Sequence, residues 1–215
     1  IVLRNIRIKE YSVKEERINI RSHAFGLLLS LAALFLLIIK AAEESQLVYF
    51  VAYLIYGLSQ VAVFAASTLY HAARKKEHRS RLNILDHSAI YLSIAGTYTP
   101  IAMLVIPGVW GWSVFAVIWL MALIGIVLKL FFTGRFDLIS TIGYVGMGLI
   151  ILVAIKPLIT HMSLWGLIWL ACGGVFYISG SVLYRLDNWP YNHAAFHFFV
   201  LIAAICHFFM IYFHT

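Results

Sequence analysis

The chain has 215 residues, of which 63% are hydrophobic and 12% are charged, and its mean hydropathy is +0.92. Soluble domains carry about 25% charged residues, so this composition excludes an ordinary soluble domain and predicts an integral membrane protein. The formal net charge is +7. In a membrane protein such an excess is expected to meet anionic lipid headgroups, so membrane lipids are the predicted partners, with no nucleic acid and no soluble partner.

Seven apolar segments are each long enough to cross the hydrocarbon core, which takes about 20 residues of α-helix. In chain order they cover residues 23–39, 47–70, 84–105, 110–132, 138–155, 164–184 and 193–213. The stretches between them are too short to hold a soluble domain. The predicted fold is therefore an all-α, seven-helix transmembrane bundle over residues 23–215, preceded by a cytoplasmic amphipathic segment over residues 1–22.

The distribution of Lys and Arg predicts the orientation, because short cytoplasmic loops carry most of the positive charge. With the N-terminus in the cytoplasm and the C-terminus outside, all but two of the 16 basic residues lie inside, the exceptions being Lys40 and Lys156. The basic residues predicted inside are Arg4, Arg7, Lys9, Lys14, Arg17, Arg21, Arg74, Lys75, Lys76, Arg79, Arg81, Lys129, Arg135 and Arg185. The expected location is the cytoplasmic membrane of a bacterium.

Two features of the middle spans concern helix packing. Pro100 lies inside the third span and predicts a kink there, because proline removes a hydrogen bond of the helix. Gly143, Gly146 and Gly148 share the fifth span. Small residues let membrane helices approach closely, so these glycines predict a close-packing helix face.

Polar side chains gather at one predicted depth. The second span ends at the cytoplasmic side with His71, and Ser67 lies one turn deeper. The third span begins at that side with Asp86, and the seventh begins there with His193 and His197 in its first two turns. Three helices are therefore expected to bring polar side chains to one layer.

The histidine spacing predicts a metal site in this layer. His193 and His197 are spaced i, i+4, which places their Cβ atoms about 5–6 Å apart on one helix face. Two such imidazoles can bind one transition metal, and His71 would add a third nitrogen. Three protein ligands and a water make the open tetrahedral arrangement of a catalytic zinc. Asp86, the only carboxylate inside a predicted span, would either hold that water or ligate the metal itself.

Another interpretation of these histidines stays open on spacing alone. A single histidine inside a membrane most often forms a hydrogen bond between helices, the role expected for His207 and His87, which lie off the proposed cluster. Ionisable groups in a membrane are costly unless they are partnered, which favours a functional role without specifying it.

Three motifs carry a resemblance to a known family: SxxxH…D in Ser67-Thr-Leu-Tyr-His71 with Asp86, HxxxH in His193-Ala-Ala-Phe-His197, and ExxN in Glu16-Arg-Ile-Asn19 followed by His23. They resemble, in order, the motifs of the hemolysin III branch of the progestin and adiponectin receptor (PAQR) family. The similarity extends over residues 12–213, nearly the whole chain.

The resemblance implies a seven-helix bundle with a Zn²⁺ ion near the cytoplasmic face. It assigns ligand roles to His71, His193 and His197, a water-holding role to Asp86 and a polar role beside the zinc to Ser67.

The ExxN element has no such assigned chemistry. For Glu16 and Asn19, a capping and anchoring role at the start of the first span stands beside a catalytic one. The role of His23, which follows them, is also open.

A zinc site of this kind would support hydrolysis. Zinc lowers the pKa of a bound water to about 7 and polarises carbonyl groups, so an amide or ester could be attacked while Asp86 carries the proton and Ser67 donates a hydrogen bond. The position among lipid-facing helices favours a lipid substrate, and relatives in the wider superfamily are associated with ceramidase-like activity. The resemblance therefore implies lipid amide or ester hydrolysis with a role in membrane homeostasis.

Two alternatives remain. One is a non-catalytic, receptor-like or membrane-homeostasis protein in which zinc is a structural clamp. The other, ranked last, is a pore-forming hemolysin. A pore would need a polar stripe through the bundle, whereas the spans below the proposed site are expected to carry mostly isolated Ser, Thr and Tyr.

Overall fold

The computed structural model describes residues 9–186 and 188–215, and every regular element within these ranges is helical. The α-helices are α1 (Val13–Glu43), α2 (Leu47–Ala72), α3 (Lys76–Pro100), α4 (Gly108–Phe132), α5 (Asp137–Leu149), α6 (Ile155–His161), α7 (Leu164–Arg185) and α8 (Asn192–His214). A π-helical turn, Ile101–Val105, continues α3, and a 3-10 segment, Ile150–Ala154, joins α5 to α6. Arg4, Arg7 and the rest of the predicted N-terminal segment before residue 9 lie outside the described residues.

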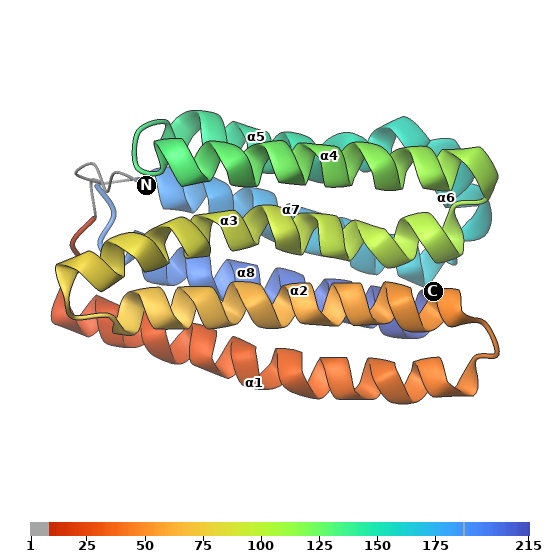
Figure 1. Ribbon diagram of the computed structural model, residues 1–215, viewed down its shortest axis with the longest axis horizontal. Helices are drawn as coiled ribbons and strands as arrows, with labels where there is room; N and C mark the ends of the chain where they lie inside the picture. Colours follow the sequence, from red (N-terminus) through yellow and green to blue (C-terminus); the bar gives the residue numbers. More distant parts are fainter. Residues whose placement is uncertain (1–8, 187) are drawn as a thin grey trace.

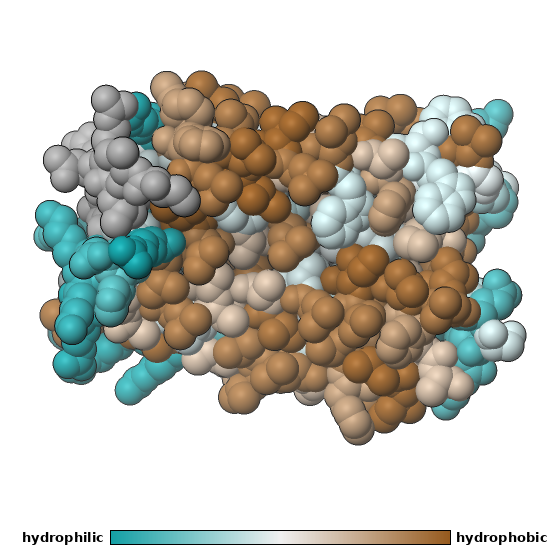
Figure 2. Space-filling view, in the orientation of Figure 1, coloured by the Kyte–Doolittle hydropathy of each residue, from teal (hydrophilic) through white to brown (hydrophobic). Residues whose placement is uncertain are grey.

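These elements make seven passes along one axis, which confirms the predicted all-α bundle (Figure 1). α3 and its π-helical turn form the third pass, and α5, the 3-10 segment and α6 form the fifth. Apolar side chains cover the middle of the bundle, and hydrophilic ones gather at its two ends (Figure 2). We call the end where α1, α3, α5 and α8 begin the basic end, because most of the described Lys and Arg residues lie there. The chain is therefore an integral membrane protein.

The first helix begins ten residues before the apolar segment that predicted it. Ser12 caps its N-terminus, since the Ser12 Oγ accepts a hydrogen bond from the Glu15 backbone N–H at 3.2 Å. A Ser followed three residues later by Glu is a typical start signal for a helix. α1 is continuous across residue 22, so the predicted boundary of the N-terminal segment does not coincide with the end of an element.

The buried face of α1 changes character along the helix. The buried side chains are polar near the basic end and small in the following turns. The first six buried residues are Glu15, Asn19, Ser22, His23, Gly26 and Ser30. A Cβ at Gly26 would overlap the ring of Phe64 on α2, so the two helices approach closely at this glycine. In a membrane, apolar side chains gain little by moving from lipid to a neighbouring helix, so close packing at small residues is a main source of helix association.

Polar side chains of α2 and α3 are joined in the middle of the bundle. The Gln60 Nε2 donates hydrogen bonds to Ser93 Oγ at 3.0 Å and to Thr97 Oγ1 at 3.3 Å, and all three residues are buried. Ser59 lies beside them, against Gly96. The expectation of mostly isolated polar residues is wrong here: they form a closed network that links two helices.

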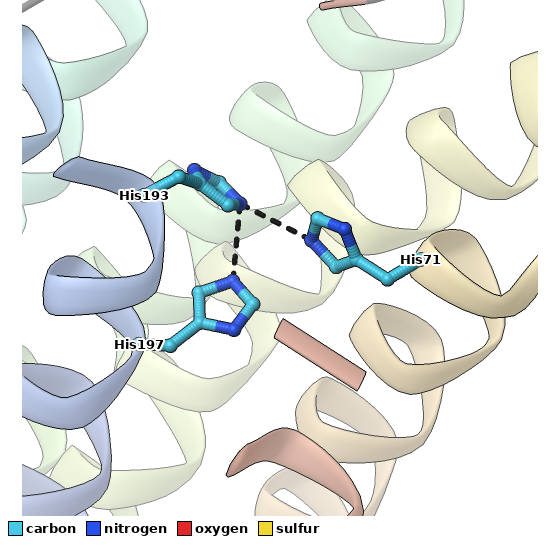
Figure 3. Close-up of side chains that lie close together, drawn as sticks. All are labelled: His71, His193 and His197. Carbon is cyan, nitrogen blue, oxygen red and sulfur yellow. Dashed lines mark hydrogen bonds between the residues drawn. The ribbon is translucent and has the colours of Figure 1, made fainter. Parts of the chain in front are cut away.

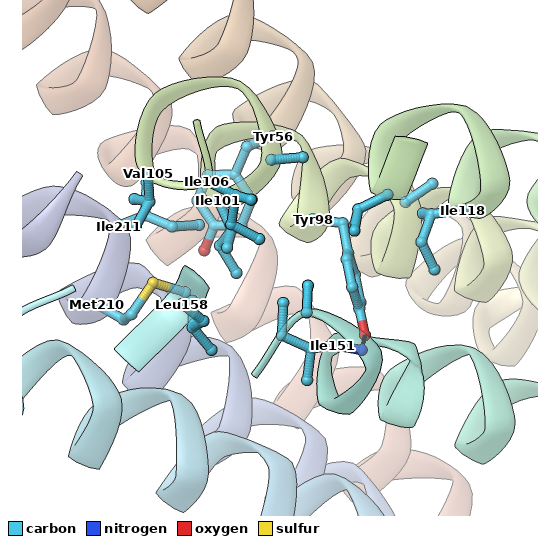
Figure 4. Packing of buried hydrophobic residues seen from close by; sticks show 14 of the residues in the cluster. Tyr56, Tyr98, Ile101, Val105, Ile106, Ile118, Ile151, Leu158, Met210 and Ile211 are labelled. Carbon is cyan, nitrogen blue, oxygen red and sulfur yellow. Dashed lines mark hydrogen bonds between the residues drawn. The ribbon is translucent and has the colours of Figure 1, made fainter. Parts of the chain in front are cut away.

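The larger apolar cluster draws residues from α1, α2, α3, α4, the fifth pass and α8 (Figure 4), and a smaller one, which includes Phe64 and Leu201, lies between α2, α3 and α8. Tyr98 links α3 to the fifth pass. Its hydroxyl lies 2.9 and 2.8 Å from the carbonyl oxygens of Met147 and Gly148 and accepts a hydrogen bond from the Ile151 N–H at 2.9 Å. These contacts lie where the fifth pass leaves α-helical geometry, so Tyr98 satisfies backbone groups that the irregular turn exposes.

Two packing predictions have different outcomes. The kink predicted at Pro100 stays a prediction, and a π-helical turn, Ile101–Val105, follows this proline directly. The predicted glycine face on α5 is wrong. A Cβ at Gly146 or Gly148 would meet nothing within 4 Å, and one at Gly143 would meet only the Tyr91 hydroxyl, at 3.4 Å.

Candidate metal centre

Three buried histidines meet at the basic end (Figure 3). His71 lies in the last turn of α2, and His193 and His197 lie in the first two turns of α8. The Nε2 atoms of His193 and His71 are 3.1 Å apart, and those of His197 and His193 are 3.0 Å apart. One nitrogen from each ring lies within 4.8 Å of the other two, and no other group of three or more potential metal ligands occurs among the described residues.

The start of α8 is fixed by its link to α7. Tyr191 adopts a left-handed backbone conformation, with φ of 58°, directly before the helix. The Asn192 Nδ2 then donates hydrogen bonds to the carbonyl oxygens of Tyr184 and Leu186, at 3.3 and 3.1 Å. Asn192 thereby satisfies carbonyl groups at the end of α7 and sets where α8 begins, one residue before His193.

Side chains of α1 contact two of these histidines at the nitrogen that faces away from the centre. The Glu16 Oε2 accepts a hydrogen bond from His71 Nδ1 at 2.7 Å, and Glu16 also forms an ion pair with Arg79. The Ser22 Oγ lies 3.3 Å from His197 Nδ1 and donates its own hydrogen to a backbone carbonyl, so it accepts from the imidazole. Both rings therefore carry hydrogen on Nδ1, which leaves the Nε2 lone pairs facing inward.

Asp86 and Ser67 lie beside the histidines. Ser67 is buried one turn from His71 on α2. The Asp86 carboxylate, on α3, lies next to the Ser67 hydroxyl and within electrostatic range of His71. It does not belong to the group of mutually close ligand atoms. Of the two roles predicted for Asp86, this placement favours holding the water over direct ligation of the metal. The ligand roles of the histidines stay predictions.

Aromatic rings cover the centre toward the basic end. The Tyr11 ring stacks on His193 with 4.6 Å between centroids and 25° between planes, and the Tyr184 ring lies 5.6 Å from His193. Burial raises the pKa of the Tyr11 hydroxyl far above its usual range, so this side chain stays neutral. Tyr11, Tyr70, Tyr144 and Tyr184 are all within electrostatic range of Asp86.

The structure thus brings together all five residues singled out for the site from the sequence. The ExxN element gains a definite place, because Glu16 contacts His71 while the helix cap belongs to Ser12. Of the two histidines predicted to lie off the centre, His207 makes the expected contact between helices, with its Nε2 3.3 Å from the Leu170 carbonyl oxygen.

Sequence reasoning missed two residues that contact the histidines, Tyr11 and Ser22, and two that support their surroundings, Arg79 through Glu16 and Asn192 at the start of α8. Ser22 had a usable signal, because it lies three residues after Asn19 on a polar face of α1. Arg79 had none, since one basic residue of a charged loop looks like any other.

Comparison with known proteins agrees with this architecture. The haemolysin-III related family matches residues 11–208. Hemolysin-3 of Bacillus cereus is 41% identical over 203 residues, covering 94% of this chain and 93% of that protein. The Hemolysin-3 homolog of Bacillus subtilis (strain 168) is 40% identical over 204 residues, covering 95% and 96%. The human Monocyte to macrophage differentiation factor is 31% identical over 165 residues, covering 74% of this chain and 68% of that protein.

The family match spans nearly the whole chain, including all three motifs and every residue of the histidine cluster. The chain therefore belongs to the haemolysin-III related proteins of the PAQR family, as its motifs predicted.

Proposed function

We propose that this chain is a zinc-dependent membrane hydrolase that cleaves an amide or ester bond of a lipid. The observation that carries this proposal is the convergence of three imidazole nitrogens, with Nε2 separations of 3.1 and 3.0 Å, beside a carboxylate and a hydroxyl. The zinc and the lipid are both part of the proposal.

The residues present fit a zinc ion. Nitrogen ligands at 2.0–2.1 Å from a tetrahedral zinc lie about 3.3 Å from one another, close to the Nε2 separations found here. Three histidines leave one coordination position open, as in catalytic sites and unlike closed structural ones. Glu16 and Ser22, which accept hydrogen bonds from the outer nitrogens of His71 and His197, are the partners that zinc-ligating histidines usually have.

Each residue then has a task. His71, His193 and His197 hold the ion, which when bound activates water near neutral pH and polarises a carbonyl group. The Asp86 carboxylate accepts the proton of the attacking water and delivers it to the leaving amine or alcohol. The Ser67 hydroxyl donates a hydrogen bond to the carbonyl oxygen of the bond that is cleaved.

A lipid substrate follows from the position of the site. The centre lies at the basic end of the bundle, where headgroups of the cytoplasmic leaflet are expected. Side chains of α2, α5 and α7 that approach Asp86 include Tyr70, Tyr144 and Tyr184, whose rings suit the boundary between acyl chains and headgroups. The amide or ester bonds of lipids lie at this depth. The membrane we infer is the bacterial cytoplasmic membrane, in line with the Bacillus relatives.

Substitution of Asp86 tests the proposal. The wild type and Asp86→Asn, both loaded with zinc and matched for metal content, are incubated with ceramides and with phospholipid esters, and the released fatty acids are quantified by mass spectrometry. We expect release by the wild type and about 100-fold less by Asp86→Asn, as for loss of a general acid or base. If the zinc-loaded wild type releases no fatty acid, or the variant matches it, the hydrolase is rejected.

A structural role for the metal is the second candidate. It is favoured by one observation: side chains of α1 contact the histidines of both α2 and α8, so one ion would tie three helices together. Metal binding would then contribute folding free energy, and the protein would act as a receptor-like or homeostasis protein. Under this reading Asp86→Asn keeps cellular function, whereas His197→Ala loses both stability and function.

Pore formation ranks last, although two relatives are named Hemolysin-3. Gln60, Ser93 and Thr97, which are buried between α2 and α3, hydrogen-bond to one another, as expected for a bond between helices and not for the lining of a water-filled pore. We expect no conductance from the purified protein in planar bilayers. Unitary currents that depend on this protein alone would reverse this ranking.

A further inference from the structure

One aromatic contact at the metal centre involves a residue with no assigned role. The His23 ring, on α1, stacks on the His197 ring with 3.6 Å between centroids and 19° between planes. This is the shortest centroid separation of any ring pair among the described residues. His23 is only 4% exposed, so the contact lies fully inside the protein.

Hydrogen bonding does not explain why a histidine lies there. Neither Nδ1 nor Nε2 of His23 has a hydrogen-bond partner among the described residues, although both atoms are buried. Neither atom joins the group of three mutually close ligand nitrogens. The contacts that remain to His23 are those of its ring faces and edges.

The surrounding packing fixes the orientation of this ring. Phe64 of α2 meets His23 edge to face, with 5.2 Å between centroids and 81° between planes. Phe64 can reach this position because Gly26, one turn after His23, has no side chain in its way. α1 and α2 therefore hold the His23 ring parallel to His197.

We propose that His23 is a positioning residue of the metal centre, whose ring face holds the imidazole of His197 in the orientation needed to ligate the ion. This inference rests on the proposed metal site. Ligand side chains must be held to within about 0.5 Å and 10–20° by their neighbours for a site to work. Outside the histidine cluster, His197 has polar contacts to Ser22 Oγ, 3.3 Å from its Nδ1, and to the Asn19 backbone, and both meet an edge of the ring rather than its face. A parallel ring packed against the face of His197 limits tilting of the imidazole, which hydrogen bonds at a ring edge do not prevent.

Three substitutions separate the ring from its nitrogens. His23→Leu removes the aromatic face and roughly keeps the volume, His23→Phe keeps a face without nitrogens, and His23→Gln keeps polar atoms without a ring. Zinc affinity is measured on the full-length, detergent-purified protein by competition with a chromophoric chelator. The visible spectrum of the Co²⁺-loaded protein reports the coordination geometry, and thermal unfolding of the metal-free protein reports folding.

We expect His23→Leu and His23→Gln to bind zinc about 10-fold more weakly, the lower end of the range for residues that orient metal ligands. Their Co²⁺ spectra should change, whereas the unfolding temperature of their metal-free forms should not. His23→Phe should bind zinc within about 3-fold of the wild type. A purely structural role would lower the unfolding temperature without changing the Co²⁺ spectrum of the folded protein.

Other results overturn the inference. Wild-type zinc affinity in His23→Leu means that the ring does not position His197. Rescue by His23→Gln but not by His23→Phe means that the nitrogens matter, and the stacking role is rejected. A folded wild type that binds no zinc contradicts the metal centre itself, and this inference with it. That result differs from equal zinc affinity in the wild type and His23→Leu, which contradicts only the role of His23.

Discussion

Two contacts from α1 decide which nitrogen of a histidine faces the centre of the site. Glu16 accepts a hydrogen bond from Nδ1 of His71, and Ser22 accepts one from Nδ1 of His197. A neutral imidazole with hydrogen on Nδ1 has its lone pair on Nε2, the atom that meets the other two rings. The first turns of α1 thus orient the Nε2 atoms of His71 and His197 toward the other rings, as the proposed metal site requires.

The Glu16 contact leads to a prediction for Glu16→Gln. An amide in place of the carboxylate loses the charge-assisted hydrogen bond to His71 and the ion pair with Arg79. We expect zinc affinity to fall about 10- to 100-fold, as for other outer partners of metal-ligating histidines. Chelator competition on the purified variant measures this.

Glu77 provides the matched control. It is exposed on the first turn of α3, where it pairs with Arg81 and touches no histidine of the cluster. Glu77→Gln should therefore bind zinc like the wild type. Equal affinities for Glu16→Gln and Glu77→Gln would show that Glu16 does not orient His71.

The sequence predicts how deep a residue lies in the membrane better than it predicts which neighbouring helix its side chain faces. Ser67, His71, Asp86 and the α8 histidines could be placed in one layer because topology fixes depth. The rotation of a helix about its axis depends on packing against its neighbours. The contacts of Tyr11 with His193 and of Arg79 with Glu16 cross between segments far apart in the chain, so no local pattern predicts them.

At the scale of helices, the sequence likewise does not predict which glycines pack against a neighbouring helix. Gly143, Gly146 and Gly148 were predicted to pack closely because they share a span, yet α5 turns Gly146 and Gly148 toward open space. No pattern in the sequence predicts close packing at Gly96 of α3, but this glycine lies against Ser59 of α2. Composition shows where small residues are, and only the assembled bundle shows which face meets another helix.

Alanine substitutions at two of these glycines should have opposite effects. In Gly96→Ala the new Cβ would overlap the Ser59 side chain, so α2 and α3 must separate, and overpacking of this kind costs about 1–3 kcal/mol. In Gly146→Ala the new Cβ meets nothing within 4 Å, and the better helix propensity of alanine should leave stability unchanged or raise it by up to about 1 kcal/mol. Thermal unfolding in detergent compares the two.

Adding Ser59→Gly to Gly96→Ala removes the atoms that overlap and should recover part of the loss. A Gly96→Ala protein as stable as Gly146→Ala would mean that the two helices are not in close contact at this position.

At the scale of the whole molecule, hydropathy was enough to predict seven passes, because only a helix of about 20 apolar residues satisfies its backbone inside a bilayer. It did not predict the helix ends. α1 and α3 extend past their apolar segments to Val13 and Lys76, through turns rich in polar residues. The candidate site is built partly on these extensions. Hydropathy therefore does not predict the contacts that α1 makes with His71 and His197.

The orientation of the bundle is a prediction that labelling can test. The exposed Lys76 lies at the basic end, and the exposed Thr160 lies at the opposite end. In a variant whose two native cysteines are replaced by alanine, Thr160→Cys should react with a membrane-impermeant maleimide in intact cells. Lys76→Cys should react only after the membrane is permeabilised, because the positive end is expected inside. The reverse pattern would place the metal centre at the outer surface.

The most direct test of the account is the metal content of the purified protein. Wild type and His197→Ala are dialysed identically against a weak chelator and analysed for zinc and other divalent metals. We predict about one zinc ion per wild-type chain and loss of the metal in the variant, because two imidazoles hold zinc far less tightly than three. A folded wild type without metal, or a variant that keeps the wild-type stoichiometry, would contradict a metal centre formed by His71, His193 and His197.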